Sequence, residues 1–178
     1  MEIRDETPAH HAAVHALHCR AFGTPAEATL VDLLRAQAQP LVSLVAVDDT
    51  DGVAGHILLS PMRAEHPAAL LMGLAPLAVA PSRHGEGIGS ALVCAGLQAC
   101  RRLGAGAVAV LGDPGYYARF GFVAASRYGL HCRYTGPGGA PPEAFMVIEL
   151  VPDSLRGTDV QAPVSGLLHY HPAFDTLD

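Results

Sequence analysis

Lysine is absent from this sequence, and positive charge of any kind is scarce. The eleven basic residues other than histidine are all arginines, set against 17 acidic residues, and the formal net charge is −6. Without lysine the chain cannot form a P-loop, whose Gly-Lys-Ser/Thr ending holds nucleotide phosphates, or a Schiff base on its own side chains. Without a basic stripe, a nucleic-acid partner is also excluded.

Other absences narrow the class of protein further. No apolar run approaches the roughly 18 residues needed to span a bilayer, and the opening MEIRDE is unlike a signal peptide, so we expect no membrane association. The four cysteines form no C-x-x-C pair. Cys94 and Cys100 fall in an expected helix, where burial as small hydrophobic residues is the simplest interpretation. These features favour a reduced, cytoplasmic protein.

The chain has the length and the apolar content for one domain with a sizeable core. It has 178 residues, of which 50% are hydrophobic, and helical and strand periodicities both occur along it. This pattern predicts a mixed α/β (α+β) domain. The expected helices cover 8–22, 24–37, 90–103 and 114–120, and the expected strands cover 2–5, 41–47, 53–62, 68–80, 107–111, 122–124 and 144–151.

A glycine-rich turn connects the expected strand 68–80 to the expected long helix. Such a turn presents backbone N–H groups at the positive end of a helix, which suits a phosphate or pyrophosphate. A dinucleotide fingerprint needs Gly-x-Gly-x-x-Gly and an acidic residue about 20 positions later. Here the glycines stand at 85, 87 and 89, and the first acid after them, Asp113, is expected to cap a helix. Dinucleotide binding is therefore disfavoured.

Two short motifs, HGEGIG at 84–89 and YARFGF at 117–122, together resemble the signatures of one family, the GNAT superfamily of acetyl-CoA-dependent N-acetyltransferases. The stretch HGEGIG at 84–89 is similar to the family's pyrophosphate loop, Gln/Arg-x-x-Gly-x-Gly/Ala, with His84 at the first position. YARFGF at 117–122 is similar to its second signature, Tyr-x-x-x-Gly-Phe. The stretches 111–117 and 142–146 resemble the YhbS-like branch. The resemblance covers about residues 2–151, and the two motifs occur in the family's order.

The resemblance implies a domain over residues 1–151. Its fold would be a central mixed, mostly antiparallel sheet, splayed between two central strands and flanked by about four helices. Acetyl-CoA would be the cosubstrate, with no metal. The remaining tail, 152–178, is expected to pack on the domain or on a partner subunit, so a homodimer is one alternative.

The resemblance also implies where acetyl-CoA binds. Pantetheine would enter where the strand before the glycine turn separates from its neighbour, and Pro76, which cannot donate to a ladder, is a local reason for that break. The backbone of Leu77 and Val79 would hold pantetheine and the acetyl carbonyl. The expected acetyl-CoA-binding residues are Leu77, Ala78, Val79, Arg83, His84, Gly85, Glu86, Gly87, Ile88, Gly89, Ser90, Pro114 and Tyr116.

Tyr117 matches the family's tyrosine that protonates the departing thiolate. A thiol with a pKa near 8.5 and a phenol near 10 exchange a proton on roughly equal terms. The alternative is that Tyr117 only packs the short helix. No carboxylate occurs in 73–79, so the general base is less evident. The candidates are His56, Glu65 and Glu143, and the alternative for His56 is a hydrogen-bonded strand histidine.

Histidines gather in two further places. His11, His15 and His18 stand at helical spacing with Cys19 and could form a metal-binding face, but a solvated helix face is favoured because no carboxylate or second cysteine joins them. The tail segment 169–171 is expected to dock rather than to catalyse.

The prediction is an acyltransferase that moves an acetyl group from acetyl-CoA to a primary amine, on a small molecule or a peptide, by direct attack. The alternative is a non-catalytic acyl-CoA-binding or interaction domain that keeps the glycine turn without turnover.

Overall fold

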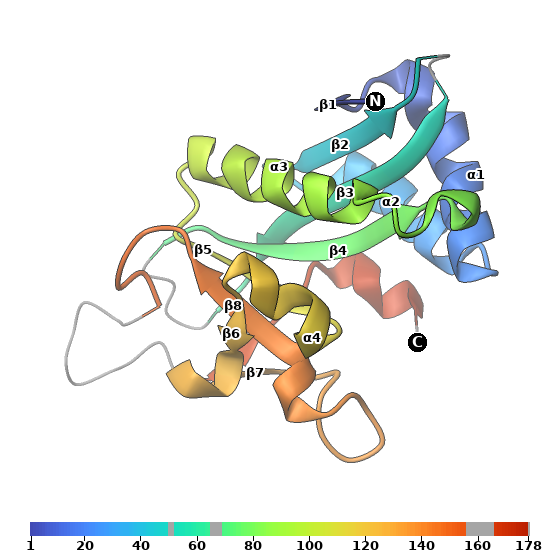
Figure 1. Ribbon diagram of the computed structural model, residues 1–178. Coiled ribbons are helices and arrows are strands. Elements are labelled where there is room, and N and C mark those ends of the chain that lie inside the picture. Colours follow the sequence, from blue (N-terminus) through green and yellow to red (C-terminus); the bar gives the residue numbers. More distant parts are fainter. Residues whose placement is uncertain (50–51, 65–68, 156–165, 178) are drawn as a thin grey trace. The chain divides into compact units, whose positions relative to one another are not determined.

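The computed structural model describes residues 1–49, 52–64, 69–155 and 166–177 (Figure 1). The α-helices are α1 (His11–Phe22), α2 (Ala26–Gln37), α3 (Ile88–Arg102) and α4 (Pro114–Tyr117). The strands are β1 (Glu2–Asp5), β2 (Val42–Val47), β3 (Val53–Met62), β4 (Leu71–Val79), β5 (Ala107–Leu111), β6 (Val123–Ala124), β7 (Leu130–Cys132), β8 (Phe145–Glu149) and β9 (Gly166–Leu168). The 3-10 helices are η1 (Pro8–His10), η2 (Pro81–Arg83), η3 (Ala118–Phe120), η4 (Ala125–Tyr128), η5 (Pro142–Ala144) and η6 (Pro172–Leu177).

Seven strands are hydrogen-bonded in the order β1-β2-β3-β4-β5-β8-β6, and β7 and β9 form a second sheet of two strands. The chain separates into two compact units. The first comprises Met1–Ser60, Ala75–Ala99 and His171–Asp178, and the second comprises Pro61–Leu74 and Cys100–Tyr170.

In the first unit, β1, β2 and β3 pair antiparallel, with Glu2 opposite Val47 and Val42 opposite Leu59. Side chains alternate between the two faces of a strand, so β3 presents different residues to different helices. A Cβ at Gly55 would lie against Ile88 and Leu92 of α3, whereas His56 contacts His18 of α1. Helix α3 therefore packs on one face of β3 and α1 on the other.

Helices α1 and α2 pack on each other, and η6 packs on α2. Their buried residues follow helical spacing: Val14, Leu17, Ala28, Leu30, Val31 and Leu34. The sequence places Phe22 on the same apolar side, but its side chain is 42% exposed. Phe22 is the last residue of α1, and Gly23 ends the helix in the left-handed conformation.

In the second unit, β4 pairs with β5 in parallel, and β5 and β6 each pair antiparallel with β8. The β4–β5 ladder runs from Leu71 opposite Ala107 to Leu74 opposite Val110. The rest of β4 begins at Ala75 and includes Pro76, which has no N–H to donate. The end of this ladder agrees with the predicted break at Pro76.

The described part of the tail, residues 166–177, contains strand β9 and the 3-10 helix η6. Strand β9 pairs in parallel with β7, and Arg63 and His169 exchange two backbone hydrogen bonds of 2.9 Å. The Tyr170 side chain is buried against Gly73 and Phe145. Sequence analysis missed both short strands because three-residue segments carry almost no periodicity.

Other expectations were correct within a few residues. Helix α3 begins at Ile88 rather than Ser90, and β8 ends at Glu149 rather than Val151. The expected burial of Cys94 is wrong, because Cys94 is exposed, whereas Cys100 is buried as expected. No helix in the described ranges is long and apolar enough to cross a bilayer.

Candidate active site

The glycine turn between β4 and α3 has the conformation that an anion-binding loop needs. Gly85 and Gly87 adopt φ values of 84° and 79°, which side-chain-bearing residues rarely adopt. The N–H of Ala91 donates to the Gly87 carbonyl at 3.0 Å. The amides of Ile88, Gly89 and Ser90 therefore precede this helical hydrogen bond, and their N–H groups lie at the positive end of α3.

Arg83, the cation of this loop, is engaged by the loop's own carboxylate. Its Nε lies 2.8 Å and 2.7 Å from the two carboxylate oxygens of Glu86, and its Nη2 lies 2.7 Å from Oε2. These hydrogen bonds raise the pKa of Arg83 and lower that of Glu86. His84, at the first position of the motif, donates from Nε2 to the Val79 carbonyl at 3.2 Å.

The β4 residues before the loop run beside β3. The Ala80 N–H donates to the Ala54 carbonyl at 2.8 Å, and a Cβ at Gly55 would lie 3.3 Å from the Ala78 carbonyl oxygen. Ala78 is buried, while Leu77 and Val79 are half-buried. The stretch 77–79 thus lies next to the part of β3 that carries His56.

Tyr117 lies in the second unit at the end of α4. Asp113 caps this helix as predicted, accepting the Gly115 N–H at 2.8 Å, and Pro114 is its first residue. The Tyr117 ring passes so close to Gly112 that a Cβ there would lie 2.5 Å from its Cε2. Burial, and then the neighbouring Tyr116, raise the pKa of Tyr117 above its ordinary value of 10. The phenol therefore remains protonated at neutral pH.

Aromatic rings surround Tyr117. Tyr116 and Phe122 contact it edge-on, with ring centroids 4.9 Å and 5.7 Å away. The Arg119 guanidinium lies 4.1 Å above the Tyr116 ring, a cation–π arrangement. Tyr116 thus packs against Tyr117 and also contacts the positively charged Arg119 side chain.

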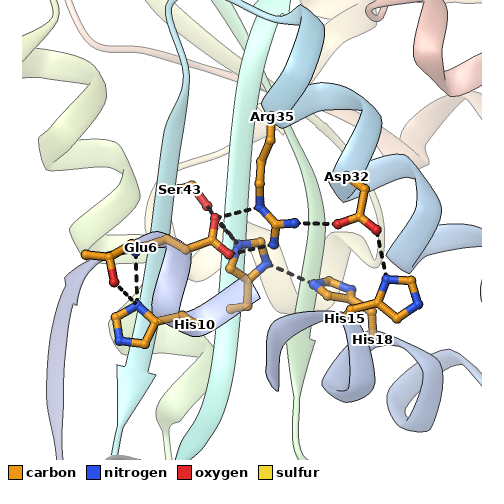
Figure 2. A network of polar contacts seen from close by, with 9 residues as sticks. Glu6, His10, His15, His18, Asp32, Arg35 and Ser43 are labelled. Atoms are coloured by element: carbon orange, nitrogen blue, oxygen red, sulfur yellow. Dashed lines mark hydrogen bonds and ion pairs between the residues drawn. The ribbon is translucent and has the colours of Figure 1, made fainter. Parts of the chain in front are cut away.

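His56 belongs to a buried network that connects α1, α2, β2 and β3 with Glu6. Figure 2 shows Glu6, His18, Arg35 and Ser43 of this network. Its Nε2 lies 2.9 Å from Ser43 Oγ, and its Nδ1 lies 2.8 Å from His18 Nε2. Ser43 Oγ donates to Glu6 Oε2 at 2.6 Å. Arg35 binds both Glu6 oxygens, through Nε at 3.0 Å and Nη2 at 2.6 Å.

The charges of this network are set by burial and pairing. Burial alone would raise the pKa of Glu6, but His56, Arg35 and Ser43 together hold it well below the ordinary 4.5. Burial lowers the pKa of His56, an effect that Glu6 only partly offsets. Burial, and then His56, lower the pKa of His18 to about 3. Both imidazoles are therefore neutral beside an ionised Glu6–Arg35 pair.

The network also corrects the interpretation of helix α1. The sequence favours a solvated histidine face there, but His18 is fully buried and His15 pairs with Asp32 at 2.9 Å. In the described ranges no group of three or more His, Cys, Asp or Glu side chains could hold a metal ion. Of the other candidate bases, Glu143 is exposed, and Glu65 lies outside the described residues.

Sequence reasoning singled out His56 but missed that Glu6, Ser43 and Arg35 belong to the same network. One signal was available, because Ser43 and His56 are polar residues inside otherwise apolar strands. A polar group buried in a strand needs a hydrogen-bond partner. In the β2–β3 register Ser43 lies opposite Leu58, two residues from His56, so Ser43 and His56 share one face of the sheet and can bond to each other.

Comparison with known proteins identifies the family. The model of the GNAT acetyltransferase family matches residues 11–122. The uncharacterized N-acetyltransferase YhbS of Escherichia coli K12 is 38% identical over 175 residues, which cover 98% of this chain and 99% of that protein. The chain belongs to the GNAT acetyltransferase family. Within it, the chain is a homologue of YhbS, as the motifs predict.

Solved GNAT structures show the same fold. The crystal structure of YhbS from Escherichia coli in complex with CoA superposes with a TM-score of 0.85 at 38% identity, over 98% of this chain and 91% of that one. A GNAT acetyltransferase from Brucella melitensis in complex with acetyl-CoA gives 0.74 at 35% identity, over 98% and 97%. The predicted GNAT fold, a mixed, mostly antiparallel sheet splayed at the parallel β4–β5 pair, is confirmed.

Proposed function

We propose that this protein transfers the acetyl group of acetyl-CoA to a primary amine by direct attack of the amine on the thioester. The observation that carries the proposal is the glycine turn. Positive-φ glycines at 85 and 87 lead into the N-terminus of a 15-residue helix, an arrangement that binds diphosphates through backbone amides. The relatives crystallised with CoA and acetyl-CoA support this assignment.

In this proposal the glycine turn holds the pyrophosphate of acetyl-CoA. The N–H groups at 85–90 are the donors, and Arg83 supplies a guanidinium next to them once it leaves Glu86. The backbone at Leu77 and Val79 binds pantetheine and polarises the acetyl carbonyl. Pro114 and Tyr116 contact the cosubstrate from the start of α4.

Tyr117 acts as the general acid. The phenol is protonated at neutral pH and can donate a proton to the CoA thiolate as the carbon–sulfur bond breaks, although burial makes it a weaker acid than free tyrosine. The amine nitrogen forms the new bond to the acetyl carbon and loses one proton to solvent, and solvent returns one proton to the Tyr117 phenolate. The products are an acetamide and the CoA thiol, and the atoms and charges balance.

His56 has an indirect part in the proposal. Both of its ring nitrogens already have partners, so it touches no substrate directly and can act only by orienting His18. The lowered pKa of each imidazole makes it a weak base near pH 7, so neither imidazole takes a proton from the amine. The amine therefore reaches the thioester already neutral.

The test is acetyl-CoA-dependent thiol release across aminoglycosides, polyamines, amino acids and peptide N-termini. Tyr117→Phe should lower kcat at least tenfold, since general acid catalysis contributes roughly 10²–10⁴, while the affinity for acetyl-CoA stays within twofold. Unchanged kcat would remove Tyr117 from the mechanism. Tight acetyl-CoA binding with no thiol release from any amine would instead support the non-catalytic binding domain.

A further inference from the structure

One nitrogen of the buried network has no hydrogen-bond partner in the part of the chain that the structure describes. His18 is fully buried, and its Nε2 is bonded to His56, but its Nδ1 has no hydrogen-bond partner among the described residues. An unpaired polar atom in a protein interior costs free energy, and such atoms are rare in native structures. This position therefore calls for a ligand or a bound water, and the network determines which chemistry that ligand must have.

The hydrogen bonds fix the tautomers of both histidines. The one Ser43 hydroxyl proton goes to Glu6, so His56 Nε2 must donate to Ser43 Oγ. Neutral His56 then has a bare Nδ1, which must accept the Nε2–H of His18. His18 in turn carries its proton on Nε2, and its Nδ1 presents a lone pair. The missing partner is therefore a hydrogen-bond donor.

Two features keep this lone pair available. Arg35 and Ser43 both bond to Glu6, which fixes one end of the series of hydrogen bonds from His18 to Glu6. The donors and acceptors in this series cannot exchange roles without breaking the Ser43–Glu6 bond. The pKa of about 3 for His18 keeps Nδ1 unprotonated at every physiological pH. His18 is thus a permanent acceptor rather than a base that switches.

The location links this acceptor to the proposed reaction. His56 holds His18 from β3, beside the β4 stretch 77–79 that is proposed to hold the acetyl carbonyl. On the other side, the His18 ring stacks parallel to Phe22, with centroids 5.8 Å apart. Phe22 is an exposed apolar side chain at the end of α1.

We propose that His18 Nδ1 accepts a hydrogen bond from the acceptor amine and thereby aims the nitrogen lone pair at the acetyl group. This inference rests on the acetyl transfer proposed above and names its acceptor: a neutral primary amine on an apolar chain or ring, which packs next to the exposed Phe22 side chain. Glu6, Ser43 and His56 are positioning residues, since they act only by fixing the His18 tautomer.

Two substitutions distinguish the contribution of His18 Nε2 from that of Nδ1. Glutamine places a polar group near the position of Nε2 and asparagine near that of Nδ1, so His18→Gln keeps the contact with His56, and His18→Asn keeps the acceptor. The matched control is His11→Gln, on the same helix. Full-length variants are assayed with 2-phenylethylamine as the probe, and histidine 15N NMR of the wild-type protein reports the tautomers independently of activity.

The expected result is a KM for 2-phenylethylamine that rises about tenfold in His18→Gln, the size expected for one lost hydrogen bond. The KM for acetyl-CoA should be unchanged, His18→Asn should recover most of the loss, and His11→Gln should match wild type. NMR should show an unprotonated His18 Nδ1 from pH 5 to pH 8.

Equal effects of the two His18 variants, or an unchanged KM in His18→Gln, would overturn the inference, as would a protonated Nδ1. Thiol release with other amines but none with 2-phenylethylamine would overturn the substrate class while leaving acetyl transfer intact. CoA binding with no thiol release from any amine would instead remove the proposed function itself.

Discussion

At the scale of single residues, the Arg83–Glu86 pair sets how much positive charge the pyrophosphate loop offers. Glu86 occupies the Arg83 fork and adds a negative charge where CoA phosphates are proposed to bind. We expect Glu86→Gln to tighten CoA binding about two- to fivefold at low salt, the range for exposed ion pairs. The gain should shrink as salt rises, because ions in solution reach both side chains, which are 33% and 45% exposed. Titration calorimetry at several salt concentrations measures both effects.

Glu2→Gln is the control for Glu86→Gln, because it changes the net charge equally at an exposed residue, the first of β1. If both variants tighten CoA binding alike, the effect comes from net charge and not from the release of Arg83. Weaker CoA binding in Glu86→Gln alone would mean that Glu86 is needed to shape the loop.

Single residues are also where prediction from sequence reached its limit. The motifs located Tyr117 and the glycine turn, because these depend on local chain geometry that neighbouring residues encode. His56 was visible as a polar residue in an apolar strand, but its bonds to His18 and Ser43 join residues 38 and 13 positions apart. No periodicity in one sequence specifies such pairs, since they depend on strand register and helix packing.

At the scale of elements, a side chain at Gly87 should strain the loop that precedes α3. Its φ of 79° is unfavourable for an L-residue, although nothing lies within 4 Å of an added Cβ. Gly87→Ala should therefore lower the unfolding free energy by about 1–2 kcal/mol. It should also weaken CoA binding at least fivefold, because the loop turns its amides away to relieve the strain. Urea denaturation and calorimetry test the two effects.

The chain contains a matched control for Gly87→Ala. Gly23, after α1, has a φ of 76° and equally open surroundings. Gly23→Ala should cost similar stability and leave CoA affinity unchanged. Should both variants lose affinity together, the loss reflects stability alone, and the loop has no special role.

Elements were predicted well where they are long or carry strong signals at their ends. The Asp113-Pro114 pair predicted the start of α4, and apolar runs on either side of a turn predicted β2 and β3. Strands β7 and β9 were missed, since each has three residues and pairs with a partner far along the chain. Their stability comes from tertiary contacts, such as the burial of Cys132 and Leu168, and not from local propensity.

At the scale of the whole molecule, the buried network should make stability depend on pH. The folded protein holds His18 at a pKa of about 3, whereas an unfolded histidine titrates near 6.5. Between these values the unfolded chain binds more protons, so stability is complete above pH 6.5 and is lost as the pH falls toward 3. One such histidine contributes a slope of up to about 1.4 kcal/mol per pH unit. His56 acts in the same direction, and Glu6 adds to the loss below about pH 4.5.

Urea denaturation between pH 7.5 and pH 4.5 measures this dependence in the wild type and in His18→Gln. The variant removes one group that must stay neutral, so its unfolding free energy should fall less steeply with acid, and the two curves should converge as the pH drops. The physical reason is that acid protonates His18 in the unfolded chain, whereas burial, and then His56 and Arg35, disfavour the protonated form in the folded protein. Parallel curves would show that folded His18 takes up its proton as readily as in the unfolded chain, and a fixed neutral acceptor at α1 would then be untenable.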